Sequence, residues 1–270
     1  MYGDVPGYES EIQTLYRAPF FVFNSLGHCR RRHTFSNDHR MKPLPECQLY
    51  AFVDTAYLRG REPGIVAQQL CDGGADLIQL RAKQSPPDEV RRLAEEILPV
   101  TTRAGIALVI NDYLSVAQET GAEFCHLGQD DFFGAGYTRV SQLATAPHAG
   151  VLRAAHPRAL ASRPGIGLSS AAPEQAARAM AAGADYLGVG PVYPTGTKPT
   201  AKPVTLEYVR WAAANIPIPW FAIGGINLRN LDDVLAAGAQ RICVVSAILN
   251  DDDLATACRR FKDRLPSRAH

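Results

Sequence analysis

Short apolar runs alternate with amphipathic segments along the chain from residue 48 onward. Each run is apolar at consecutive positions, a pattern typical of strands that are covered on both faces. The eight runs that predict strands are Gln48–Asp54, Ala75–Arg81, Ile106–Asp112, Ala122–Gly128, Gly165–Ser169, Ala184–Gly190, Trp220–Ile226 and Gln240–Ser246. Apolar residues three and four positions apart predict helices between them. Such helices are expected at Ile65–Cys71, Glu89–Arg103, Pro173–Ala182, Leu206–Ala214, Leu231–Ala237 and Leu254–Arg264.

Glycine-alanine pairs mark the corners where helical segments lead into strands. They occur at Gly74-Ala75, Gly121-Ala122, Gly183-Ala184 and Gly238-Ala239. Glycine is favoured there because a helix often ends in left-handed backbone. Eight strand–helix units predict an α/β fold, a (β/α)₈ barrel in a single domain. An open doubly wound sheet is the alternative, but no Gly-x-Gly-x-x-Gly turn follows the first strand.

The first 46 residues do not share this pattern. They show neither strand nor helix periodicity, and they contain the basic cluster Arg30–Arg32. We therefore expect residues 1–46 to be a poorly ordered N-terminal extension and residues 47–266 to form the barrel. Glycines and prolines between Asp131 and Gly165 predict a fourth helix that is short or followed by a long loop.

Composition limits the classes of binding partner and the cellular compartment that we expect. A net charge of +1 gives no reason to expect nucleic acid or an anionic membrane, so small molecules are the expected partners. No apolar stretch approaches the ~18 residues that span a bilayer. The six cysteines form no Cys-x-x-Cys pair, which favours a reduced, cytoplasmic compartment. The sequence leaves open whether the protein is a homo-oligomer.

Polar side chains follow the predicted strands at their carboxyl ends, where barrels of this kind carry their chemistry. Gln79, Arg81 and Lys83 lie on one side of the second strand, and two cations with an amide suit an anion. Asp112 and Asp131 follow the third and fourth strands. Either aspartate alone could be a helix cap. Together they favour Mg²⁺, which takes one or two carboxylates and completes its coordination with water and phosphate oxygens.

Two further segments suit phosphate. The loop after the sixth strand presents Thr195, Thr197 and Lys198, whose hydroxyls and ammonium suit a phosphate or diphosphate. Taken alone, these residues could equally belong to a solvated loop, but polar groups recur at the ends of the other strands and favour phosphate. Gly225 and Ser246 end the last two strands, where backbone N–H groups commonly bind phosphate in barrels. Two anion sites and a metal site in one mouth predict one phosphorylated substrate and one diphosphorylated, Mg²⁺-bound substrate.

Motifs in the same order resemble those of the thiamine phosphate synthase family, over roughly Leu49 to Leu265. They are Gln79-Leu80-Arg81-x-Lys83, Ile110-Asn111-Asp112, His126-Leu127-Gly128-Gln129-x-Asp131, Gly167-x-Ser169, Gly188 to Lys198, Ala222 to Ile226, and Val244 to Ile248. The family is a (β/α)₈ barrel that joins hydroxymethylpyrimidine diphosphate to a thiazole phosphate. The resemblance implies a transferase that uses Mg²⁺ to ease the departure of diphosphate, after which the thiazole nitrogen attacks the methylene carbon.

The resemblance also implies roles for individual residues. One set would bind the pyrimidine diphosphate: Gln79, Leu80, Arg81, Ala82, Lys83, Asn111 and Lys198. Ser169 would contact substrate near the reacting centre. A second set would bind the thiazole phosphate: Thr195, Gly196, Thr197, Gly225, Val245 and Ser246. Asp112 and Asp131 would hold Mg²⁺, and the implied catalytic residues are Arg81, Lys83, Ser169 and Lys198.

The chain departs from the family pattern at several positions. Tyr113 stands where the family usually has Arg, Ser170 and Ala171 where it has Thr-His, and Thr205 where Gly is common. A thiazole tautomerase is one alternative, but it would use a His at the position of Ala171. A non-catalytic, regulatory barrel that binds a phosphate ligand is another, and it would not need two aspartates beside several cations. We interpret His126 as a packed strand residue.

Overall fold

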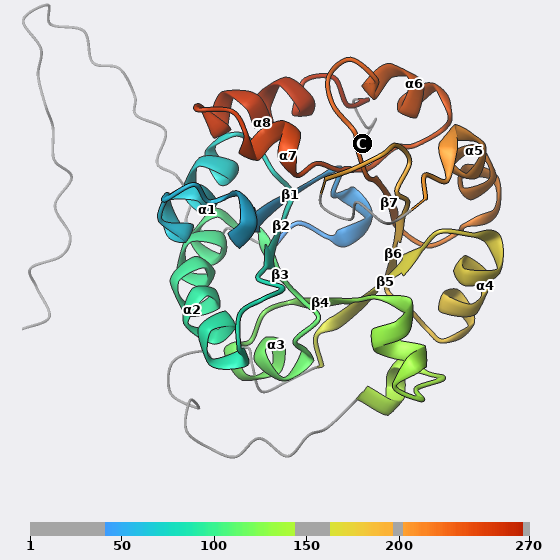
Figure 1. Cartoon of the computed structure of the whole chain (residues 1–270), viewed down its shortest axis with the longest axis horizontal. Helices are drawn as coiled ribbons and strands as arrows, with labels where there is room; N and C mark the ends of the chain where they lie inside the picture. The colour runs from blue at the N-terminus through green and yellow to red at the C-terminus, as the bar shows by residue number, and fades with distance from the viewer. Residues whose placement is uncertain (1–40, 144–162, 197–201, 267–270) are drawn as a thin grey trace, which may run out of the picture. The chain divides into compact units, whose positions relative to one another are not determined.

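Eight parallel strands pair in chain order, and the last pairs back with the first, so the sheet closes into a barrel (Figure 1). The computed structural model describes residues 41–143, 163–196 and 202–266. The strands are β1 (Leu49–Asp54), β2 (Leu77–Arg81), β3 (Ala107–Asn111), β4 (Phe124–Leu127), β5 (Gly165–Ser170), β6 (Tyr186–Val189), β7 (Trp220–Ile223) and β8 (Ile242–Cys243). The predicted (β/α)₈ barrel is confirmed, because a closed sheet lacks the edges of a doubly wound one.

Helices surround the ring of strands (Figure 1). They are α1 (Pro63–Asp72), α2 (Pro87–Ala104), α3 (Leu114–Thr120), α4 (Pro173–Ala181), α5 (Thr205–Asn215), α6 (Leu231–Ala236), α7 (Ser246–Leu249) and α8 (Leu254–Lys262). Shorter turns are η1 (Leu44–Glu46), η2 (Thr55–Tyr57), the π-helical η3 (Asp130–Gly134) and η4 (Val140–Leu143). α2 shows why the helices cover the sheet: Val90, Leu93 and Ile97 are buried at helical spacing.

The ends of the last two strands differ from the prediction. β7 ends at Ile223 because Gly224 and Gly225 take left-handed backbone, with φ of 101° and 65°. β8 ends at Cys243, and Ser246, which we placed in the strand, begins α7 instead. α3 was not among the helices we singled out, because seven residues carry too little periodic pattern.

Only part of the fourth strand–helix unit and of the N-terminal segment lies within the described residues. After β4 the chain forms η3 and η4, and the rest of the long connector, residues 144–162, lies outside the described residues. Residues 1–40 of the predicted extension lie outside them too. Residues 41–46 contact the barrel: the carbonyl of Pro45 accepts a hydrogen bond from Arg241, 2.8 Å away. The division at residue 46 stays a prediction.

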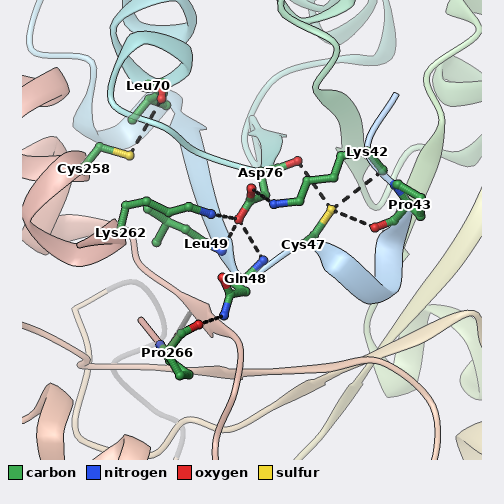
Figure 2. A network of polar contacts seen from close by, with 10 residues as sticks. All are labelled: Lys42, Pro43, Cys47, Gln48, Leu49, Leu70, Asp76, Cys258, Lys262 and Pro266. Atoms are coloured by element: carbon green, nitrogen blue, oxygen red, sulfur yellow. Dashed lines mark hydrogen bonds and ion pairs between the residues drawn. The ribbon is translucent and has the colours of Figure 1, made fainter. Parts of the chain in front are cut away.

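A buried carboxylate holds both ends of the described chain against the start of the barrel. Asp76 accepts hydrogen bonds from the backbone amides of Gln48 and Leu49, at 2.8 and 2.9 Å. It also pairs with Lys42, 2.6 Å away, and with Lys262 of α8 (Figure 2). Burial alone would raise the pKa of Asp76, but these hydrogen bonds outweigh it and hold the pKa below its ordinary value.

Replacing Asp76 by Asn should lower the free energy of unfolding by about 2 kcal/mol at pH 7. This loss is smaller than that expected for breaking a fully buried ion pair, because Lys42 is partly solvated. A depressed folded pKa stabilises the protein above the unfolded pKa of about 3.9, and this contribution is lost as the pH falls through the folded pKa. Urea unfolding at pH 7, 5 and 3 should therefore show the difference between wild type and variant shrinking towards pH 3. The exposed Asp72 supplies the control, Asp72→Asn. A difference that is constant with pH would contradict the assigned role.

Candidate active site

A cavity opens at the carboxyl ends of the strands, inside the barrel. Aromatic rings close it from below: Tyr50 lies edge-on to Tyr186 and Phe221, with centroids 6.1 and 5.2 Å away. Each strand contributes to the lining because parallel strands present their carboxyl ends at the same mouth. The predicted site residues that line the cavity are Gln79, Arg81, Asn111, Ser169, Thr195, Gly225, Val245 and Ser246.

Arg81 is held at the mouth by a carboxylate from the neighbouring strand. Asp54 ends β1 and is paired with Arg81 in the register of β1 and β2. The two side chains form an ion pair of 2.8 Å, and Asp54 is only 1% exposed. Asp54 also accepts a hydrogen bond from the backbone amide of Ala56, which fixes its carboxylate. The guanidinium therefore has a set position beside the cavity, where its positive charge can act on an anion.

Asn111 carries a polar group that the described residues leave unpaired. Its side chain ends β3 and lines the cavity, and its Nδ2 is buried with no hydrogen-bond partner among the described residues. A buried amide N–H that lacks a hydrogen-bond partner costs free energy. A ligand oxygen in the cavity would satisfy it. This is the clearest structural sign that the cavity binds something polar.

Asp112 lies beside Asn111 in a strained backbone conformation. Its φ is 66°, in the left-handed region that residues other than glycine rarely adopt. Such strain is often found at functional sites. The conformation turns the chain out of β3, and the carboxylate lies 3.0 Å from the ammonium of Lys83. The structure thus brings together Lys83 and Asp112, two of the predicted site residues.

Asp131 folds back from η3 towards the end of β4. The backbone amide of Gly128 donates to its carboxylate at 3.0 Å. A Cβ at Gly128 would lie 2.6 Å from the same oxygen, so glycine permits this close approach. Burial is the main reason that the pKa of the Cys125 thiol is raised, and the negative charges of Asp112 and Asp131 raise it further. The backbone amide of Asp112 donates to the carbonyl of His126 at 2.9 Å, so both aspartates are tied to the carboxyl end of β4.

This pair of carboxylates fits Mg²⁺ rather than a metal that needs a full set of protein ligands. In the described part of the chain, no group of three or more His, Cys, Asp or Glu residues is placed to hold a metal. Mg²⁺ is typically bound by one or two carboxylates with water and substrate phosphate oxygens. Asp112 and Asp131 supply hard oxygen donors of that number, beside cations that suit the phosphate.

The opposite wall of the cavity is built from loops and is suited to a phosphate. Gly225 packs on the loop after β6, where a Cβ would lie 2.5 Å from the carbonyl oxygen of Pro194. Asn227 and Asn230 both donate to the Gly225 carbonyl, at 3.2 and 3.0 Å, and so hold this peptide in place. Thr195 lines the same wall.

The remaining predicted residues are placed away from the lining or lie outside the described chain. Leu80 and Ala82 are buried, at 0% and 2% exposure, and do not line the cavity. Gly196 is exposed, and a Cβ there would lie 3.4 Å from the hydroxyl of Tyr57. Thr197 and Lys198 lie outside the described residues.

Sequence reasoning missed Asp54 and underestimated His126. Asp54 ends the first predicted strand, so the rule that selected Arg81 and Asn111 would have selected it as well. We interpreted His126 as a packed strand residue, but it lines the cavity and its Nε2 lies 3.0 Å from the hydroxyl of Ser169. Side chains alternate between the two faces of a strand, and that of Phe124 lies inside the barrel. Counting two residues on from Phe124 would therefore have placed His126 inside as well.

The chain is similar in sequence and in structure to known proteins. The family model described as thiamine monophosphate synthase matches residues 49–141 and 149–248. A thiamine-phosphate synthase of Methanospirillum hungatei is 41% identical over 220 residues, which cover 81% of this chain and 97% of that protein. One from Thermus thermophilus is 42% identical over 194 residues, covering 72% and 84%. The structure of a thiamine phosphate pyrophosphorylase from Pyrococcus furiosus superposes with a TM-score of 0.65 at 27% identity, covering 80% and 94%.

Proposed function

Because the chain belongs to the thiamine monophosphate synthase family, we propose that it joins 4-amino-2-methyl-5-hydroxymethylpyrimidine diphosphate to a thiazole phosphate, with or without a carboxylate, giving thiamine phosphate and diphosphate. As a member of that family it is an enzyme of the transferase class. The observation that carries the proposal of these substrates is the unpaired Asn111 amide in a cavity shared with Arg81, next to the Lys83–Asp112 pair.

The reaction breaks the carbon–oxygen bond between the pyrimidine methylene and the diphosphate, and the electron pair leaves with the diphosphate. Negative charge grows on that leaving group, so the preorganised cations Arg81 and Lys83 stabilise the transition state more than the bound substrate. Lys198 joins them in this proposal, by its resemblance alone. The electron-rich aminopyrimidine supports the cation that remains. The lone pair of the thiazole nitrogen then forms the new carbon–nitrogen bond, and no protein nucleophile is needed.

Asp112 and Asp131 are the residues that would hold Mg²⁺. The ion, when bound, supplies positive charge to the departing diphosphate. Lys83 neutralises part of the charge on Asp112, which allows two aspartates and a diphosphate to share one mouth. Asn111 and Gln79 orient the pyrimidine substrate, and Leu80 and Ala82 support that wall from the buried side.

The thiazole phosphate is proposed to bind at the loop wall. Gly225, Val245 and Ser246 line the cavity where barrels commonly bind phosphate through backbone N–H groups. Thr195 adds a hydroxyl, and Gly196 with Thr197 continues the loop. Binding both substrates side by side converts their encounter into a step within one complex, which is the main source of rate in such a site.

A cytoplasmic location belongs to this proposal. The described cysteines are all present as free thiols, which suits a reducing compartment. Among the described residues, no helix is long and apolar enough to cross a membrane. The proposed partners are the two small-molecule substrates.

The test is the formation of thiamine phosphate by the purified full chain from the two substrates. With Mg²⁺ we expect product, with excess EDTA none, and with Mg²⁺ added back the original rate. Binding of the thiazole phosphate is measured in parallel by calorimetry. Absence of product, with the thiazole phosphate still bound, would overturn the proposal and leave a phosphate-binding barrel. Product formed at the full rate in EDTA would overturn the role of Mg²⁺ alone.

A further inference from the structure

A continuous chain of hydrogen bonds runs across the barrel, and four of its five side chains line the cavity: Tyr50, Gln79, His126 and Ser169. Gln79 Nε2 donates to the hydroxyl of Tyr50 at 2.5 Å, and this hydroxyl lies 3.0 Å from that of Tyr186. The Tyr186 hydroxyl lies 3.2 Å from Nδ1 of His126, whose Nε2 lies 3.0 Å from the hydroxyl of Ser169. The chain therefore joins two cavity-lining residues, Gln79 and Ser169, through three side chains.

The first link sets the direction of all the others. An amide nitrogen can only donate, so the Tyr50 oxygen accepts from Gln79 and its own proton is directed to Tyr186. The Tyr186 proton then has one acceptor in the chain, Nδ1 of His126. An imidazole that accepts at Nδ1 is neutral and carries its proton on Nε2. That proton is donated to the Ser169 oxygen.

The consequence lies at Ser169. Its oxygen accepts from His126, and within the described residues its hydroxyl has no other partner. Its own proton is left to point into the cavity. A serine hydroxyl can accept or donate, and the chain removes this ambiguity in favour of donation.

We propose that Tyr50 and Tyr186 are positioning residues that hold His126 as the neutral Nε2–H tautomer and thereby present the Ser169 hydroxyl as a hydrogen-bond donor to an acceptor atom of the pyrimidine substrate. The proposal rests on the proposed function for the identity of that substrate. The hydrogen-bond geometry itself does not depend on it. A donor kept ready in this way needs no reorganisation when charge develops in the reaction.

The surroundings preserve this arrangement. Burial raises the pKa of both Tyr50 and Tyr186 well above the ordinary value, so both hydroxyls keep their protons. A Cβ at Gly167 would lie 2.1 Å from the Tyr186 ring, so glycine is needed there for the ring to join the chain of hydrogen bonds. A Cβ at Gly188 would lie 3.2 Å from His126, which is already close contact.

The experiment measures the tautomer of His126 directly. Full-length protein labelled with ¹⁵N-histidine is studied by NMR near pH 8, and the signals of His126 are identified by their loss in His126→Gln. Wild type should show a protonated Nε2 and an unprotonated Nδ1. Tyr186→Phe should give a mixture of tautomers, because Nδ1 loses its donor. Tyr50→Phe should also give a mixture, although Tyr50 does not touch His126, because Tyr186 then has no fixed direction.

Tyr208→Phe is the matched control. The Tyr208 hydroxyl is also buried and hydrogen-bonded, to Ser170 at 2.5 Å and to the Ala172 carbonyl at 2.8 Å, but it is not part of the chain. The Tyr208→Phe substitution should leave the tautomer of His126 unchanged. In the synthase assay, Tyr186→Phe should lower kcat about tenfold, the value of roughly one hydrogen bond, with little change in the KM for thiazole phosphate.

The outcomes separate this inference from the function on which it rests. A wild-type His126 protonated on Nδ1 would mean that the chain runs in reverse, and would overturn the proposal. An unchanged tautomer in Tyr186→Phe or Tyr50→Phe, or a kcat as in Tyr208→Phe, would overturn it too. Absence of synthase activity in wild type, with the expected tautomers, would overturn the proposed function and leave the hydrogen-bond chain established.

Discussion

Replacing Asp112 by Asn should lower kcat by about 10³-fold and leave the affinity for thiazole phosphate nearly unchanged, a loss of roughly 4 kcal/mol of transition-state stabilisation. Asn is chosen because it tolerates left-handed backbone better than most residues, and Asp112 has a φ of 66°. The variant therefore keeps the turn after β3 and loses one negative charge and one of the two proposed Mg²⁺ ligands. Steady-state kinetics over a range of Mg²⁺ concentrations, with calorimetry for thiazole phosphate, measures both effects.

Asp130→Asn supplies the control for that experiment. Asp130 is exposed and lies next to Asp131 in η3, so the substitution removes a charge from the same loop without touching the proposed ligands. We expect its kcat to stay within about twofold of wild type, as for most surface substitutions. An Asp112→Asn variant that turns over like Asp130→Asn would refute the metal site. Loss of thiazole phosphate binding together with turnover would instead indicate a damaged fold.

The fold could be predicted because its signals are local. Runs of apolar residues and helical spacing recur along the barrel, and a Gly-Ala pair precedes four of the eight predicted strands. The glycines of these pairs all have positive φ in the structure: Gly74, Gly121, Gly183 and Gly238. The exact ends of β7 and β8 were not predictable in this way. Both depend on backbone angles at Gly224, Gly225 and Val245, which the packing of neighbouring loops decides.

Several residues that line the cavity could be predicted one by one, but which side chains contact one another could not. The end of a strand identifies Arg81, Asn111 and Asp112 without knowledge of their neighbours. Which side chains meet depends on register between strands: Asp54 meets Arg81 because β1 and β2 pair at those two residues. The contact between Tyr50 and Tyr186 joins residues 136 positions apart and needs the closed barrel. Sequence spacing alone contains no such information.

Replacing Arg81 by Met should both destabilise the protein and abolish most of its activity. Asp54 is 1% exposed and would be left without its cation, which we expect to lower the free energy of unfolding by about 3 kcal/mol. The leaving diphosphate would lose one of its fixed cations, which we expect to lower kcat by about 10³-fold. Urea unfolding and steady-state kinetics measure the two losses separately.

The double variant Asp54→Asn with Arg81→Met distinguishes the two roles. Removing both charges leaves no unpaired buried ion, so most of the lost stability should return, and kcat should stay as low as in Arg81→Met. Asp54→Asn alone keeps the cation but frees it from its fixed position, so it should reduce kcat by about tenfold. If the double variant regained activity together with stability, Arg81 would be a structural residue only. If Asp54→Asn matched wild type in kcat, the ion pair would not be what positions Arg81 for the leaving group.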